Sequence, residues 1–123
     1  MEVHQTPELT QIQHTLAKQP RAILSHPFGP EAEVYKIMGK MYALLQIRPP
    51  YRLTLKCKPD EAEILIDQFA GIHPGYHMNK RHWITLELAD DVPHDLIDTL
   101  IESSYQLVVE KLPKSDQARL ELA

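Results

Sequence analysis

The sequence predicts an α+β domain: a mainly antiparallel sheet with helices packed on one face, in the order α-β-β-β-α-β-α. Three observations lead to this prediction. Some segments repeat apolar residues at helical spacing, others alternate apolar and polar residues as half-buried strands do, and proline or glycine separates most of these segments. With 123 residues, 43% of them hydrophobic, the chain is expected to form one domain over residues 1–123.

The first predicted element is a helix that begins at residues 6–8. Thr6 is a suitable N-cap and Pro7 suits the first helical position. Apolar residues follow at helical spacing, and the helix is expected to end before Pro20. Residues 25–31 contain two prolines and a glycine, so they are predicted to form a loop.

The next two elements are a β-hairpin and a third strand. Residues 33–48 predict the hairpin, because two β-prone runs flank Gly39, which can adopt the positive φ of a short turn. Residues 52–58 predict the third strand, because their alternation is the cleanest in the chain. One face of that strand carries Arg52, Thr54, Lys56 and Lys58, and the other carries Leu53, Leu55 and Cys57.

A second helix is predicted to begin at residues 59–63. Asp60 and Glu63 have the spacing of a capping box, and acidic groups suit the positive end of the helix dipole. Gly71 is the expected C-cap. Residues 73–75, His-Pro-Gly, are then predicted to form a turn that leads into the last strand.

The last strand lies within residues 77–88, and a long helix follows it. That helix is predicted to begin at residues 90–93 and to end at Pro113, with an apolar inner face that also carries a serine and a tyrosine. Residues 115–122 predict a further short helix. We expect the serine and the tyrosine, Ser104 and Tyr105, to tie the long helix to the sheet.

The segment at residues 77–88 is also the main functional signal. Lysine, arginine and histidine precede the single tryptophan of the chain, Trp83. The alternation places Trp83 on the more polar face of its strand and His82 on the apolar face, where His82 is expected to be a partly buried structural residue. A large aromatic group on a polar face indicates a recognition surface, although the N-terminal helix or a loop covering Trp83 is an equal alternative.

Charge is unevenly distributed along this chain of net charge -4. Residues 36–58 contain six basic and no acidic residues, whereas residues 87–121 contain nine acidic and three basic residues. The overall balance argues against a general polyanion binder, but the basic segment permits a local anion site.

The chain is expected to be cytoplasmic. It has no apolar run of the ~18 to 20 residues that cross a bilayer, and its first residues lack a secretory pattern. Its single cysteine, Cys57, fits a reducing compartment and is expected to be buried rather than reactive.

Four segments of the chain resemble the YjbR/MmcQ family of small bacterial proteins. They are residues 34–43, 55–59, 77–83 and 103–108, and the Asn-Lys-x-His-Trp run at residues 79–83 is the most specific of them. The resemblance implies a "double wing" α+β fold, first described for the DNA-binding domain of a phage transcription factor. The likeness of their fold to that phage domain is also the reason why the members of this family are commonly labelled DNA-binding.

The resulting hypothesis is a non-enzymatic DNA-binding or regulatory protein. Cations on one sheet face would contact phosphates, and an exposed tryptophan would stack on an unpaired base or lie on a sugar. The alternative is a module that binds an acidic protein or a small anion through the same face. The candidate residues for either function are Lys36, Arg52, Lys56, Lys58, Asn79, Lys80, Arg81 and Trp83.

Catalysis is the weakest class. The histidines lack the spacing and the partners of a metal site, and glycine-rich phosphate loops and nucleophile motifs are missing from the sequence. We therefore predict no cofactor, no metal and no catalytic residues. For Asn79, a structural role in shaping the turn before the last strand is favoured over direct contact with a ligand.

Overall fold

The computed structural model describes residues 7–75, 79–88 and 91–121. The described chain contains six strands in one sheet, with the spatial order β1-β2-β3-β4-β6-β5, and every neighbouring pair is antiparallel. The elements in chain order are α1 (Pro7–Ala17), β1 (Ile23–Ser25), β2 (Ala32–Ile37), β3 (Lys40–Gln46), β4 (Arg52–Lys56), α2 (Pro59–Gln68), β5 (Ile72–Pro74), β6 (Trp83–Glu87), α3 (His94–Glu110) and α4 (Lys114–Glu121).

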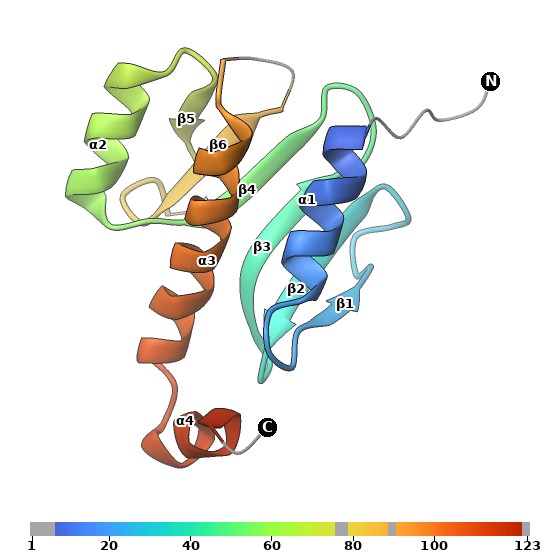
Figure 1. Ribbon diagram of the computed structural model, residues 1–123, viewed down its shortest axis with the longest axis vertical. Coiled ribbons are helices and arrows are strands. Elements are labelled where there is room, and N and C mark those ends of the chain that lie inside the picture. Colours follow the sequence, from blue (N-terminus) through green and yellow to red (C-terminus); the bar gives the residue numbers. More distant parts are fainter. Residues whose placement is uncertain (1–6, 76–78, 89–90, 122–123) are drawn as a thin grey trace.

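The helices cover one face of this sheet, as predicted. Figure 1 shows α1 and α3 side by side in front of the strands, with α2 beside β5 at one edge and α4 beyond the end of α3. α3 packs on β3 and β4 and also contacts α1. The predicted α+β class with an antiparallel sheet and a helical layer is therefore confirmed.

The register between β4 and β6 confirms the predicted alternation. Lys56 lies opposite Trp83, and Arg52 lies opposite Glu87. Between them, the hydroxyl groups of Thr54 and Thr85 are 2.9 Å apart in a buried hydrogen bond. Since paired residues on neighbouring strands project to the same side, the tryptophan and the cations of β4 share one face of the sheet.

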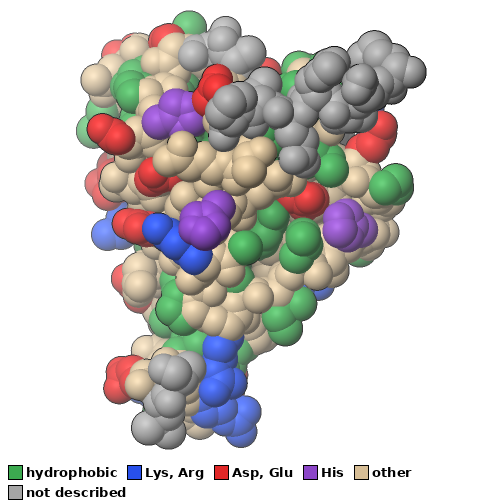
Figure 2. Space-filling view, turned by 45° about the vertical axis from the view of Figure 1, so that its right-hand side comes forward, with side chains coloured by type: hydrophobic (Ala, Val, Ile, Leu, Met, Phe, Trp, Pro, Cys, Tyr) green, Lys and Arg blue, Asp and Glu red, His purple; other side chains and the backbone are tan. Residues whose placement is uncertain are grey.

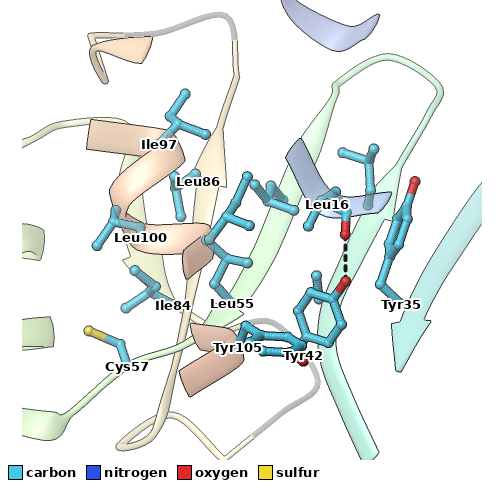
Figure 3. Close-up of a cluster of buried hydrophobic side chains, with 14 of the residues drawn as sticks. Leu16, Tyr35, Tyr42, Leu55, Cys57, Ile84, Leu86, Ile97, Leu100 and Tyr105 are labelled. Atoms are coloured by element: carbon cyan, nitrogen blue, oxygen red, sulfur yellow. Dashed lines mark hydrogen bonds between the residues drawn. The ribbon is translucent and has the colours of Figure 1, made fainter. Parts of the chain in front are cut away.

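The other face of the sheet forms the core beneath α1 and α3. A tyrosine cluster links the layers: the Tyr42 hydroxyl donates to the Leu16 carbonyl at 2.6 Å, and the Tyr42 and Tyr105 rings meet edge to face at 5.3 Å (Figure 3). The Tyr105 hydroxyl donates to the Pro20 carbonyl at 2.6 Å. Tyr105 therefore ties α3 to the segment that follows α1.

Several local predictions need correction. Residues 73–75 were expected to be a turn, but β5 extends over Ile72–Pro74 as an edge strand, where a proline is tolerated because an edge residue need not donate to the ladder. β1 was not predicted, and it includes Ser25, the first residue of the expected loop. Both strands are too short to show an alternation.

The caps of α2 also differ from the prediction. Its N-cap is Lys58 without a side-chain hydrogen bond, and Asp60 accepts instead from the neighbouring Glu61 N–H. Its C-cap is Phe69 rather than Gly71. The turn of the predicted hairpin is confirmed, since Gly39 has a φ of +82°. The predicted cap Thr6, the start of the functional segment at His77 and Met78, and Asp90 lie outside the described residues.

The β1 edge carries most of the large hydrophobic side chains that are exposed in the described chain: Ile23, Leu24 and Phe28. Figure 2 turns this side of the molecule forward and shows hydrophobic side chains on its surface. No helix within the described ranges combines the length and the hydrophobicity that crossing a bilayer requires.

Candidate functional site

The candidate site begins where β3 and β4 separate. The last paired residues at this end are Ala43 and Leu55. Beyond them Ser104 of α3 lies between the strands: its Oγ donates to the Tyr42 carbonyl at 2.6 Å and accepts from the Lys56 N–H at 2.8 Å. The serine therefore takes the place of a direct ladder bond, and the C-terminal part of α3 lies against the separated strand ends. This confirms the predicted role of Ser104.

A groove lies beside this junction, at the end of the sheet where β3 begins, β4 ends and β6 begins. Its volume is about 370 Å³, and we call it the first compartment. The last turn of α3 and its C-cap form the opposite wall. The lining residues are Lys40, Met41, Lys56, Trp83, Val108, Lys111 and Leu112.

The first compartment combines an aromatic ring with uncompensated positive charge. The Lys56 ammonium lies 6.0 Å from the centre of the half-buried Trp83 ring, within the range of a cation–π contact. Lys40 and Lys111 add two further ammonium groups from the first residue of β3 and the α3 C-cap, and the compartment lining contains no carboxylate. In the described part of the chain, none of these three lysines is within ion-pair distance of an acidic side chain.

A second compartment of about 240 Å³ adjoins the first and shares Lys56 and Lys111 with it. Its remaining lining is mixed in character and includes one carboxylate, that of Glu110. The two shared lysines thus lie on the boundary between the compartments. The residues that line the second compartment alone are Cys57, Lys58, Pro59, His82, Leu107 and Glu110.

Glycine at position 75 allows the close approach that positions Trp83. The Gly75 N–H donates to the Trp83 carbonyl at 2.8 Å. A Cβ at position 75 would lie 2.6 Å from the Trp83 Cβ, which is closer than two carbon atoms can approach. The backbone after β5 therefore fixes the direction in which the Trp83 side chain leaves β6.

The structure brings together only part of the predicted residue set. Lys56 and Trp83 meet in the first compartment, and Lys58 lines the second. Lys36 lies opposite Met41 on the neighbouring strand and does not line either compartment. Arg52 lies at the far end of β4, where its Nε is 2.9 Å from a Glu87 carboxylate oxygen. That ion pair neutralises much of the Arg52 charge.

The turn before β6 carries the remaining predicted residues. Asn79 shapes it, as predicted, because its side-chain oxygen accepts from the Arg81 N–H at 3.0 Å and its carbonyl accepts from the His82 N–H at 3.1 Å. Lys80 and Arg81 are exposed on this turn, near Trp83 in sequence but outside both compartments. They can extend the positive field of the groove without forming its walls.

Two further predictions concern reactive side chains. His82 was expected to be partly buried, but its side chain is exposed because the alternation of β6 begins only at Trp83. Cys57 is buried, as predicted. Burial raises the pKa of the Cys57 thiol from its ordinary value of 9.0 to about 11, and the nearby Glu61 carboxylate adds to the effect. The thiol is therefore protonated at neutral pH.

The sequence interpretation missed Lys40, Met41 and Lys111 as site residues. Lys40 belongs to the basic segment that was recognised, next to the turn glycine, so a closer reading of that turn could have found it. No signal pointed to Lys111, because only the packing of α3 brings its C-cap to the strand ends. Among the residues that the structure describes, no group of three or more His, Cys, Asp and Glu side chains is arranged to hold a metal ion.

Comparison with known proteins adds the following findings. A family model described as YjbR matches residues 17–107. The uncharacterized protein YbdF of Escherichia coli O157:H7 is 40% identical over 98 residues, which cover 79% of this chain and 80% of that protein. The uncharacterized protein YjbR of Escherichia coli K12 is 32% identical over 90 residues, covering 73% of this chain and 75% of that protein. The crystal structure of protein DR2400 of Deinococcus radiodurans, which has a DUF419 domain, matches with a TM-score of 0.85 and 35% identity over 96% of this chain and 92% of that chain.

Proposed function

The chain belongs to the YjbR family, and we propose that it is a non-enzymatic binding protein for nucleic acid that uses the groove beside Trp83. One observation carries the proposal: Lys40, Lys56 and Lys111 meet around a half-buried tryptophan, and no acidic side chain of the described residues lies within ion-pair distance of them. Ammonium groups contact phosphates, and an indole ring stacks on bases. Both parts of a nucleotide thus find a partner within one groove.

The distribution of charge supports a local contact rather than a broad one. The chain has a net charge of -4, so the molecule as a whole repels a polyanion at long range. Arg52, which would have extended the basic face along β4, is paired with Glu87. Binding is therefore concentrated at one end of the sheet and involves few phosphates, with Lys80 and Arg81 beside it.

A binding role rather than a catalytic one is also part of the proposal. Cys57 lines the second compartment and is the strongest nucleophile near the groove, but its raised pKa keeps it as the unreactive thiol. The neighbouring His82 is exposed on the turn before β6. A protonated, buried thiol contributes apolar packing and not covalent chemistry.

The test is a binding titration of the full chain with fluorescein-labelled single-stranded DNA, duplex DNA and RNA at low and moderate salt, followed by anisotropy. We expect saturable binding that weakens with salt. For a single strand, the negative slope of the logarithm of the binding constant against the logarithm of the salt concentration becomes less steep by ~0.7 for each phosphate that a variant no longer neutralises. Lys56→Gln and Lys40→Gln remove the charge but keep a long polar side chain, so both should weaken binding.

Lys18→Gln is the matched control, because Lys18 is an exposed lysine that follows α1 and lines neither compartment. It should bind as the parent does. Flat titrations with all three nucleic acids at low salt would remove the proposal. Equal losses in the Lys18 and Lys40 variants would mean that only net charge matters and that the groove is not the site.

A second candidate function has one observation in its favour. The first compartment, at about 370 Å³, is near the small end of ligand pockets, which span ~300–1,000 Å³. It therefore also fits a small organic anion. Displacement of labelled DNA by inorganic phosphate or a dicarboxylate at millimolar concentration would favour this candidate, provided that competitors that carry a nucleobase displace the DNA no better.

A further inference from the structure

We infer that the groove is built for two consecutive nucleotides of a single strand, one in each compartment, with Lys56 and Lys111 on the phosphate that links them. This inference rests on the proposed function and names the form of its ligand. It starts from the second compartment, which adjoins the first and differs from it in lining.

The order of chemical groups along the groove matches the order along a nucleic acid strand. The first compartment offers Trp83 and the apolar side chains of Met41 and Val108, which suit the face of a base or a sugar. The boundary then offers the two shared lysines, Lys56 and Lys111, which suit a phosphate. A base, a phosphate and a second base are arranged in this sequence in a dinucleotide.

The second compartment is suited to a base with hydrogen-bonding groups. Leu107 and Pro59 supply apolar surface, and Lys58 supplies a cation at the α2 N-cap. Glu110 is the one carboxylate of the lining, and a carboxylate can accept from a donor on the edge of a base, such as the N3–H of thymine or the exocyclic amino group of cytosine. A site for phosphate alone would not be expected to place an acidic group there.

The position of Trp83 indicates that the nucleic-acid ligand is single-stranded. In a duplex both faces of each base are covered by its neighbours, and only the base edges are accessible in the grooves. Trp83 is half-buried between the strand ends and the end of α3, so its ring cannot reach into a stacked duplex. An unpaired base can instead be placed against the ring.

Lys56 connects the two parts of this site. Its ammonium group lies 6.0 Å from the centre of the Trp83 ring and lines both compartments. A phosphate at the boundary attracts this ammonium group more strongly than the ring does, because a full negative charge exceeds the field of an aromatic quadrupole. Phosphate binding thereby frees the face of the indole on which a base stacks.

The test is a competition series against labelled single-stranded DNA with the full-length parent chain. The competitors are thymidine monophosphate, thymidine diphosphate, the 5′-phosphorylated dinucleotide pdTpdT and the corresponding tetranucleotide. We expect pdTpdT to bind at least about tenfold more tightly than thymidine monophosphate, because its second base covers the apolar side chains of Leu107 and Pro59 and can donate to the Glu110 carboxylate. Thymidine diphosphate carries nearly the same charge as the dinucleotide but has one base, and it should not reproduce the gain.

Two variants assign the gain to a compartment. Lys58 lines only the second compartment, so Lys58→Gln should reduce dinucleotide binding by a larger factor than monophosphate binding. Lys40 lines only the first, so Lys40→Gln should weaken both ligands by a similar factor. Both side chains are exposed, so their replacement is not expected to affect folding.

The outcomes separate this inference from the proposed function. Equal affinity for the monophosphate and the dinucleotide, with intact DNA binding, would overturn the two-nucleotide site and leave the proposed function standing. Equal affinity of thymidine diphosphate and pdTpdT would also overturn it, since charge alone would then explain the gain. Duplex DNA that binds as tightly as the single strand would contradict the single-stranded form, and failure of every nucleic acid to bind would overturn both proposals.

Discussion

Replacing Ser104 with alanine tests the junction that holds the groove together. Ser104 is fully buried, and its hydroxyl joins the Tyr42 carbonyl at 2.6 Å to the Lys56 N–H at 2.8 Å. Alanine leaves both backbone groups without this partner. An unsatisfied buried group costs ~1–3 kcal/mol, and the Lys56 N–H lies nearer to the groove, where water can partly replace the serine. We therefore expect Ser104→Ala to lower the free energy of unfolding by about 2–4 kcal/mol.

The assay is equilibrium unfolding in urea, with Ser103→Ala as the matched control. Ser103 is the preceding residue of α3 and is only half-buried. Both variants gain the same helix propensity from alanine, so the difference between them isolates the buried hydroxyl. Ser103→Ala is expected to change the free energy of unfolding by less than ~0.5 kcal/mol, as most surface substitutions do. Equal stabilities of the two variants would refute the reasoning.

Three further predictions concern the groove and the buried thiol. Gly75→Ala should shift the fluorescence emission of Trp83 and weaken nucleic-acid binding, because the new Cβ would lie 2.6 Å from the Trp83 Cβ. Gly39→Ala is the control: its new Cβ would meet no atom within 4 Å, but position 39 has a φ of +82°, so this variant should lower the free energy of unfolding and leave the Trp83 emission unchanged. Glu110→Gln should tighten binding of thymidine monophosphate about two- to fivefold, because it removes a negative charge that repels the phosphate of the ligand beside the boundary lysines. A weaker or unchanged affinity measured by competition would contradict this. Native Cys57 should react with iodoacetamide far more slowly at pH 8 than in denaturant, since its pKa is raised from 9.0 to about 11. A thiol with a raised pKa stabilises the folded state below pH 9 and loses that contribution as the pH rises towards about 11. Unfolding monitored between these values should therefore show a falling stability that Cys57→Ala reduces, and the raised pKa values of the buried Tyr35, Tyr42 and Tyr105 account for the fall that remains near the upper end of this range.

The strand alternation predicted the sheet well wherever the strands are long. Residues 52–58 alternate strictly. The structure forms β4 from Arg52–Lys56 and pairs its polar face with that of β6, which places Lys56 opposite Trp83, whereas Lys58 is the N-cap of α2 rather than part of the strand. The prediction succeeded because only the apolar face of the sheet packs beneath the helices, so a shift of one residue would move polar side chains into the core and the pattern fixes the register. β1 and β5 could not be found in the same way, since three residues show no period and Pro74 argues against a strand.

The site was only partly predictable for a related reason. Sequence alternation identifies residues that share a strand face, and it correctly joined Lys56 to Trp83. It cannot identify residues that meet because a helix ends near a strand, and Lys111 is of this kind. It also cannot show that a cation is neutralised by a partner, as Arg52 is by Glu87 across the sheet.

The uncompensated charge at the groove is the strongest argument that this end of the sheet has a ligand. Three lysines around one compartment repel one another, and a carboxylate within ion-pair distance would relieve that repulsion. Among the described residues none lies that close, and Glu110 lines only the adjoining compartment. The chain has 17 acidic residues, and it uses one of them to neutralise Arg52 a few residues along the same strand. Lysines kept unpaired beside an aromatic ring, in a chain with enough acids to pair them, are what a protein needs when the neutralising charge is supplied by its partner.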